Sequence, residues 1–202
     1  GVAAINLVHQ RPDVDPSRLF VYGQSLGGAL AIAALAQAGP EKARALIVEG
    51  SFASYKEVVR LILDDSWITW LFQYPFAYLF FSDADAPLQH LPQLAEVPLL
   101  VIHGQRDETV PLEAGHQIVE AYPGEDVRFW TVPSAGHMQI FSPPGSPWRR
   151  ELVEYLDAHL PPGDYTSREP PQYSHGGGRT RGAAGVPRIA PRQDAASPVR
   201  SP

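Results

Sequence analysis

Three side chains in this sequence have the chemistry of nucleophilic catalysis. Ser25 stands in Gly-Gln-Ser-Leu-Gly, between an apolar strand-like run and an Ala-rich helical segment. A serine hydroxyl is a weak nucleophile at neutral pH and needs a base, which an acid in turn orients. Asp107 in "HGQRDETVP" and His137 in "PSAGHMQIF" each follow a later strand-like run. This order predicts a catalytic triad with Ser25 as nucleophile, Asp107 as orienting acid and His137 as base.

The glycines around Ser25 have a steric explanation. A nucleophile must project from a tight turn where a strand and a helix pass close together, so small residues are expected at Gly23 and Gly27. Gly28 is expected to let the helix approach the sheet. The helix start directs free N–H groups toward developing negative charge, which makes the Leu26 N–H the expected first donor of an oxyanion hole. The alternative is a glycine-rich turn with an uninvolved serine.

The elements that must position these residues alternate along the chain. Strand-like runs lie at 18–23, 44–50, 97–104 and 127–133, and helical patterns lie at 25–39, 111–122 and 146–160. Such alternation is typical of an α/β fold, a mostly parallel sheet flanked by helices. Sites on open parallel sheets form at the carboxyl ends of the strands, and each of the three triad residues follows such an end. We therefore expect one α/β domain over residues 1–160.

Several other titratable residues compete for the same roles. Glu49, at the end of the second strand, is an alternative acid, whereas Glu108 would need a shifted loop to replace Asp107. His103 lies inside a buried strand and is expected to be a hydrogen-bonded core residue. His116 is expected on a helix surface. The remaining histidines have no strand-end position: His9, His90, His159 and His175.

A long insertion, residues 51–92, separates the second and third strands and holds "LILDDSWITWLFQYPFAYLFF", the most aromatic part of the chain. A transmembrane helix needs about 20 apolar residues, and two Asp, one Gln and one Pro interrupt this run. A cap over an apolar pocket is favoured over a membrane-surface element, and core packing is an alternative for part of it. No membrane segment is expected in this chain.

Composition limits the partners and cofactors. The chain has 202 residues, a net charge of -6 and no Cys, so nucleic acid is not an expected partner and a disulfide framework is excluded. No His, Asp or Glu grouping has metal-ligand spacing, and no Gly loop with Lys for a phosphate follows a strand. We expect neither a metal nor a cofactor.

Residues 161–202 differ from the rest. Pro and Gly make up 14 of these 42 residues and aliphatic side chains are few, so we expect a disordered tail. Six Arg against three acidic residues make a weak contact with an anionic surface the alternative to a plain extension.

Four motifs in the same order, "GQSLGGA", "VEGSF", "PLLVIHGQRDETVP" and "SAGH", resemble the α/β-hydrolase superfamily and, more narrowly, its Bem46-like branch. The resemblance covers roughly residues 1–160. It implies a serine hydrolase of acyl esters or thioesters, with Ser25, Asp107 and His137 in the roles given above. Lipid-like acyl groups are common in that branch, so Trp67, Trp70 and Phe72 in the insertion are expected to set acyl chain-length preference. Met138-Gln139 departs from the polar Asn or Asp of many relatives.

The resemblance also bears on how the chain begins. In the resembled fold the nucleophile follows the fifth strand, whereas a single strand precedes Ser25 here. We therefore expect a C-terminal fragment that lacks the loop with the second oxyanion donor and that is poorly folded and nearly inactive alone. Its location stays open between cytoplasmic and membrane-associated, through an N-terminal anchor in the missing part. A serine peptidase and a non-catalytic binding module of the same fold are the alternative functions.

Overall fold

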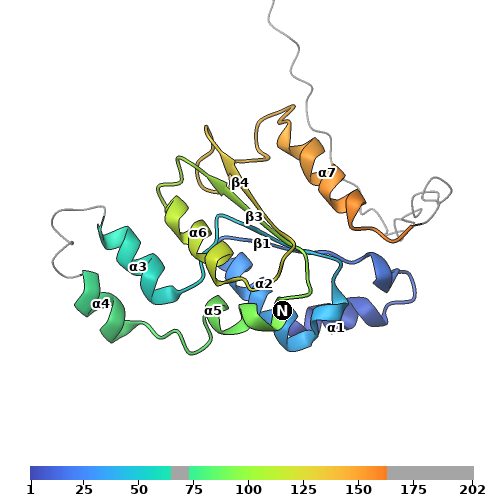
Figure 1. Cartoon of the computed structure of the whole chain (residues 1–202), viewed down its shortest axis with the longest axis horizontal. Helices are drawn as coiled ribbons and strands as arrows, with labels where there is room; N and C mark the ends of the chain where they lie inside the picture. The colour runs from blue at the N-terminus through green and yellow to red at the C-terminus, as the bar shows by residue number, and fades with distance from the viewer. Residues whose placement is uncertain (65–72, 163–202) are drawn as a thin grey trace, which may run out of the picture. The chain divides into compact units, whose positions relative to one another are not determined.

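Four parallel strands form the sheet at the centre of the computed structural model, which describes residues 1–64 and 73–162 (Figure 1). The described residues belong to one compact unit, Gly1–Gly163. The strand order is β1 (Val21–Gln24), β2 (Leu46–Glu49), β3 (Leu99–Gly104) and β4 (Val127–Val132). The helices are α1 (Val2–Gln10), α2 (Leu26–Ala38), α3 (Tyr55–Asp64), α4 (Gln73–Phe80), α5 (Pro87–His90), α6 (Leu112–Ala121) and α7 (Trp148–Ala158). The predicted α/β architecture is confirmed.

The strands are shorter than the apolar runs that predicted them. β1 begins at Val21 because Pro16–Arg18 forms a 3-10 turn that Asp15 caps. All six residues of β3 are buried, as expected for an inner parallel strand covered on both faces. The register pairs Gln24 with Glu49, so β1 and β2 end side by side. The loops that follow the strands therefore open at the same edge of the sheet.

Alternate residues of the strands face two separate apolar clusters. Leu46 and Val48 lie in a cluster with residues of α2 and α6, whereas Ala45 and Ile47 lie in a cluster with Tyr155 of α7. Because neighbouring side chains of a strand point to opposite faces, these clusters cover the two sides of the sheet. Figure 1 shows α7 on the opposite side from α2 and α6. The three layers hold the strand ends at fixed positions.

The insertion 51–92 forms α3, α4, α5 and a 3-10 turn, Leu91–Leu94. Its first part contacts the body of the domain. Phe52 and Val58 form an apolar cluster with Ala29 of α2, Ala114 of α6 and Val110. Residues 65–72, which include the Trp67, Trp70 and Phe72 of the acyl-chain expectation, lie outside the described residues, and so does the predicted disordered tail from residue 163 onward.

Asp83 fastens the start of α3 from across the insertion. Its Oδ1 accepts hydrogen bonds from the backbone N–H groups of Tyr55, at 2.8 Å, and Lys56, at 3.2 Å. Its Oδ2 accepts one from the Ser54 hydroxyl at 2.8 Å. The first N–H groups of a helix have no acceptor within the helix, so Asp83 acts as a cap supplied from 27 to 29 residues away.

Large apolar side chains are exposed on α4. Phe76, Leu79 and Phe80 are 45%, 77% and 67% exposed, although the Phe76 and Phe80 rings contact each other with centroids 5.1 Å apart. Among the residues described, no helix is long and apolar enough to cross a membrane.

Candidate active site

Ser25 is the N-cap of α2, in the turn that joins β1 to this helix. Its backbone has φ 52 and ψ -127, a conformation that residues with a Cβ rarely adopt. The turn is held on both sides: the Ser25 N–H donates to Glu49 O at 2.8 Å, and the Gly28 N–H donates to Ser25 O at 2.9 Å. Strained backbone of this kind persists only where surrounding contacts fix it, and it concentrates at functional sites.

The glycines around Ser25 differ in how much space a side chain would have. A Cβ on Gly23 would lie 2.4 Å from Gly27 O, and a Cβ on Gly28 would lie 2.7 Å from the Ser51 side chain. The predictions for Gly23 and Gly28 agree with these close approaches. The prediction that Gly27 must also be small is wrong, because a Cβ there would meet no atom within 4 Å. The Gly27 backbone fills the space, and its Cβ position points away.

His137 lies between Ser25 and Asp107, in the loop after β4. Its Nε2 is 3.0 Å from Ser25 Oγ, and its Nδ1 is 2.7 Å from Asp107 Oδ2. An ionised carboxylate only accepts hydrogen bonds, so in the neutral ring Nδ1 carries the proton and Nε2 is free to accept the Ser25 hydroxyl proton. The three residues selected from the sequence therefore form one continuous hydrogen-bonded chain.

Asp107 is held rigidly in the loop after β3. Its side chain is 1% exposed. The Asp107 Oδ1 accepts the N–H groups of Thr109 at 2.9 Å and Val110 at 2.8 Å, which leaves Oδ2 for His137. Glu108, the neighbouring alternative, has an exposed side chain in this loop. The turn thus presents Asp107 to the imidazole.

His103 supports the same loop from inside β3. Its Nε2 donates to Val110 O at 2.8 Å, and this nitrogen is 3.7 Å from Asp107 Oδ2. Burial lowers the pKa of His103 below its ordinary value of 6.5, in spite of the neighbouring Asp107 carboxylate. The expectation of a hydrogen-bonded core histidine is confirmed, and His116 is exposed on α6 as expected.

Gly50, which follows β2, was not predicted as part of the site. It has φ 56, and a Cβ built on it would lie 3.3 Å from both Asp107 Oδ2 and His137 Nδ1. Its N–H donates to Ile102 O at 2.9 Å. A side chain here would press on the hydrogen bond between Asp107 and His137. The glycine at the end of the strand-like run in "VEGSF" is the signal that could have found it.

Glu49, the alternative acid, makes a different set of contacts. Its Oε2 accepts hydrogen bonds from the Tyr22 hydroxyl and from Gln24 Nε2, the latter at 2.7 Å. The hydrogen bond to His137 Nδ1 is made by Asp107 instead. Leu26, expected to donate the first oxyanion N–H, is the first residue of α2, directly beside Ser25.

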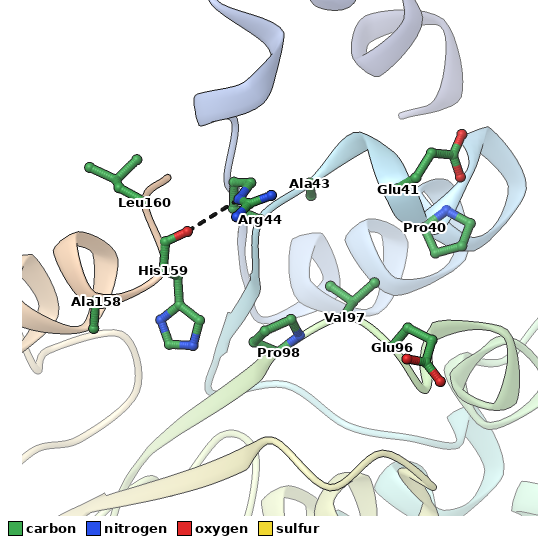
Figure 2. A pocket seen from close by; sticks show the side chains of 10 residues that line it. All are labelled: Pro40, Glu41, Ala43, Arg44, Glu96, Val97, Pro98, Ala158, His159 and Leu160. Carbon is green, nitrogen blue, oxygen red and sulfur yellow. Dashed lines mark hydrogen bonds between the residues drawn. The ribbon is translucent and has the colours of Figure 1, made fainter. Parts of the chain in front are cut away.

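A hollow of about 700 Å³ lies at the other end of the strands (Figure 2). Several of its lining residues, among them Arg44 and Pro98, precede β2 and β3, whereas the site residues follow the strands. Figure 2 shows the Arg44 guanidinium donating to His159 O across one side of this hollow. No member of the Ser25 site lines it. Within residues 1–64 and 73–162, no group of three or more His, Asp or Glu side chains is placed to hold a metal ion.

Comparisons with known proteins agree with this fold. The fold is that of the α/β hydrolases: a Pyrococcus furiosus esterase superimposes with a TM-score of 0.57 at 21% identity, over 79% of this chain and 60% of that one. The family model described as "Prolyl oligopeptidase family" matches residues 2–162. The chain therefore belongs to the prolyl oligopeptidase family, within a superfamily of hydrolases.

Curated relatives extend the comparison. The chain is 30% identical to YfhR of Escherichia coli O157:H7 over 161 residues, which are 79% of this chain and 52% of that protein. It is 28% identical to protein bem46 of Schizosaccharomyces pombe over 110 residues, or 54% of this chain and 33% of that protein. The chain spans about half the length of YfhR.

Proposed function

We propose that this chain carries the catalytic residues of a serine hydrolase that cleaves carboxylic ester or thioester bonds through an acyl-enzyme. The observation that carries the proposal is the hydrogen-bonded chain from Ser25 Oγ through His137 to Asp107. Ser25, the first member of this triad, lies in a strained turn at the start of α2, a position that exposes a nucleophile to substrate.

The reaction follows from the contacts. Ser25 Oγ attacks the substrate carbonyl carbon while its proton moves to His137 Nε2, and Asp107 stabilises the imidazolium that results. The Leu26 N–H, at the positive end of α2, donates to the oxyanion. His137 then gives the proton to the departing alkoxide or thiolate. Water, deprotonated by the same nitrogen, hydrolyses the acyl-Ser25 ester and restores the serine.

Apolar surroundings support an acyl substrate. Leu26, the residue directly after the nucleophile, exposes 52% of its surface. The first part of the insertion packs on Val110, three residues beyond Asp107. We propose that this insertion forms the acyl-facing wall of the site, and that the protein belongs to the Bem46-like branch, which the similarity to bem46 supports.

A peptidase is the second candidate, because the matching family is described by its oligopeptidases. The same three residues serve either reaction, and the leaving group alone differs. Comparing a p-nitrophenyl ester with a peptide p-nitroanilide of the same acyl part separates the two candidates. Turnover of the ester without turnover of the p-nitroanilide supports the proposal, and Ser25-dependent turnover of the p-nitroanilide supports the peptidase.

The test of the nucleophile is covalent labelling of the naturally expressed protein with a fluorophosphonate. Mass spectrometry of the labelled peptide is expected to place the adduct on Ser25, and Ser25→Ala is expected to abolish it. Ser25→Ala and His137→Ala are each expected to remove most of the turnover, and the double variant little more, because the residues act as a unit. Labelling of another serine contradicts the assignment of Ser25, whereas no labelling at all contradicts the proposed function and leaves a binding module as the better account.

A further inference from the structure

Glu49 is a fully buried carboxylate next to the Ser25 turn, and the triad does not use its side chain. Its exposed fraction is 0%, and Oε1 has no hydrogen-bond partner among the described residues. No Lys, Arg or His in the described part of the chain lies within ion-pair distance of it. Burying a carboxylate without a cation destabilises the folded protein. A functional role would therefore explain why Glu49 lies here.

Both hydrogen-bond donors to Glu49 come from β1. Tyr22 and Gln24 alternate with Gly23, so their side chains share one face of the strand, and both donate to Glu49 Oε2. Partial burial and this hydrogen bond raise the pKa of Tyr22 well above its ordinary value of 10.0, so the hydroxyl stays a donor at neutral pH. The carboxylate therefore holds the strand on either side of the glycine that approaches α2 most closely.

The backbone of Glu49 completes the arrangement. Its carbonyl accepts the Ser25 N–H at 2.8 Å. The next residue, Gly50, is the one whose Cβ position lies 3.3 Å from Asp107 Oδ2 and His137 Nδ1. The Glu49-Gly50 dipeptide thus accepts a hydrogen bond from the nucleophile turn and lies beside the acid–base pair.

We propose that Glu49 is a positioning residue, whose carboxylate fixes Tyr22 and Gln24 so that Ser25 Oγ stays within hydrogen-bond distance of His137 Nε2. The inference rests on the proposed function. The strained Ser25 backbone needs such support, because any relaxation of the turn moves Oγ away from the base. Misplacement of a reacting group by about 1 Å costs on the order of 10²-fold in rate.

The test compares four variants of the naturally expressed protein. Glu49→Leu removes both acceptor oxygens, Glu49→Gln keeps one, and Tyr22→Phe removes one donor. Tyr122→Phe is the matched control, because the Tyr122 hydroxyl also donates a hydrogen bond to a distant segment, to Val97 O, but it does so before the start of β3, whereas Glu49 stands at the end of β2. Each variant is measured for thermal unfolding, for the burst of a p-nitrophenyl ester, which counts working sites, and for kcat per counted site with KM.

We expect kcat per site to fall about 10²-fold in Glu49→Leu and about tenfold in Tyr22→Phe, with KM unchanged. Glu49→Gln is expected to retain at least about tenfold more kcat than Glu49→Leu, since a neutral acceptor still orients both donors. Tyr122→Phe is expected to lower the unfolding temperature without changing kcat per site.

Two results overturn the inference. If Glu49→Leu and Tyr22→Phe unfold more readily but keep the parent kcat per counted site, Glu49 is structural only. If Tyr22→Phe behaves as Tyr122→Phe does, the hydroxyl does not position the turn. A parent protein that neither labels with a fluorophosphonate nor shows a burst overturns the proposed function, and the inference falls with it.

Discussion

At the scale of single residues, close backbone approach explains why the Ser25 turn accepts so few side chains. Gly23 lies against the Gly27 carbonyl, and Gly28 lies against Ser51. Gly50 leaves space beside Asp107 and His137. Gly27, although part of the same short motif, has open space at its Cβ position. The short sequence motif therefore contains glycines that close contacts require, such as Gly23, and a glycine that no close contact requires, Gly27.

Gly23→Ala, in β1, and Gly27→Ala, in α2, form a matched pair of substitutions on the two sides of Ser25. A methyl group at 23 meets backbone atoms of Gly27 and Gly28, which cannot rotate away, so we expect a loss of about 1–3 kcal/mol or more in the free energy of unfolding. A methyl group at 27 meets nothing and favours the helix, so stability is expected to stay constant or rise by up to about 1 kcal/mol. Urea denaturation of both variants checks this, and equal losses would contradict it.

The positions of Ser25, Asp107 and His137 could be predicted because each follows a strand, and strand ends of a parallel sheet meet at one edge. Their hydrogen-bonded arrangement agrees with that reasoning. The roles of Gly50 and Tyr22 could not be predicted in this way. Their contacts are with residues far away in the sequence, and the apolar periodicity of a strand or helix does not show which distant residues meet. Burial of Glu49 could be anticipated from its strand, but its donors could not.

At the scale of elements, the start of α3 depends on a residue that lies beyond α4. Asp83 satisfies two N–H groups of the first turn of α3 and the Ser54 hydroxyl. Its negative charge also lies at the positive end of the helix dipole. The same apolar cluster that receives Val58 of α3 includes Val110, near Asp107 of the site. Asp83 therefore caps the helix whose Val58 packs in the same cluster as Val110.

Asp83→Ala is expected to lower the free energy of unfolding by about 1–2 kcal/mol, because a helix cap is lost and three donors are left without their acceptor. Ser82→Ala is the matched control: the Ser82 hydroxyl accepts one exposed N–H, from Ala84, and its loss is expected to cost less than about 0.5 kcal/mol. Chemical denaturation measures both. Equal effects at the two positions would show that Asp83 is not a cap.

Strands and helices of the body were predictable from their apolar periods, and the structure moves their ends by a few residues. The 3-10 turn before β1 shortens that strand, since Pro16 starts a turn instead of extending the sheet. The insertion was less predictable, because its many aromatic residues are consistent both with a cap over a pocket and with packing in the core. Phe76 and Phe80 contact each other while staying exposed, an outcome that hydrophobicity alone does not indicate.

At the scale of the whole molecule, the stability of the domain is coupled to the protonation of His103. This histidine is fully buried between β3 and the Asp107 loop, and burial lowers its pKa from 6.5. The unfolded chain therefore binds a proton more readily than the folded one in the range below 6.5. The stabilisation that neutral His103 contributes is full above that pH, and it is lost as pH falls toward the lowered folded value.

We expect acidification from about pH 7.5 to about pH 5 to destabilise the parent protein more steeply than His103→Gln, with a difference in slope of at most about 1.4 kcal/mol per pH unit. The glutamine keeps an N–H for Val110 O but does not titrate. Free energies of unfolding measured across this range give the two slopes. Because the other histidines are the same in both proteins, parallel curves would show that His103 is not responsible.

The hydrogen bond between Ser25 and His137 joins residues 112 positions apart, and the one between His137 and Asp107 joins residues 30 apart. No local segment can make either bond, so the chain must first close long loops and pair β1 through β4. Parallel pairing of this kind is intrinsically slow during folding. In a refolding chain, helices can return while Ser25 is still inert, and its reactivity is then the last native property to appear. Recovery of Ser25 reactivity therefore reports that strands β1 through β4 have all paired.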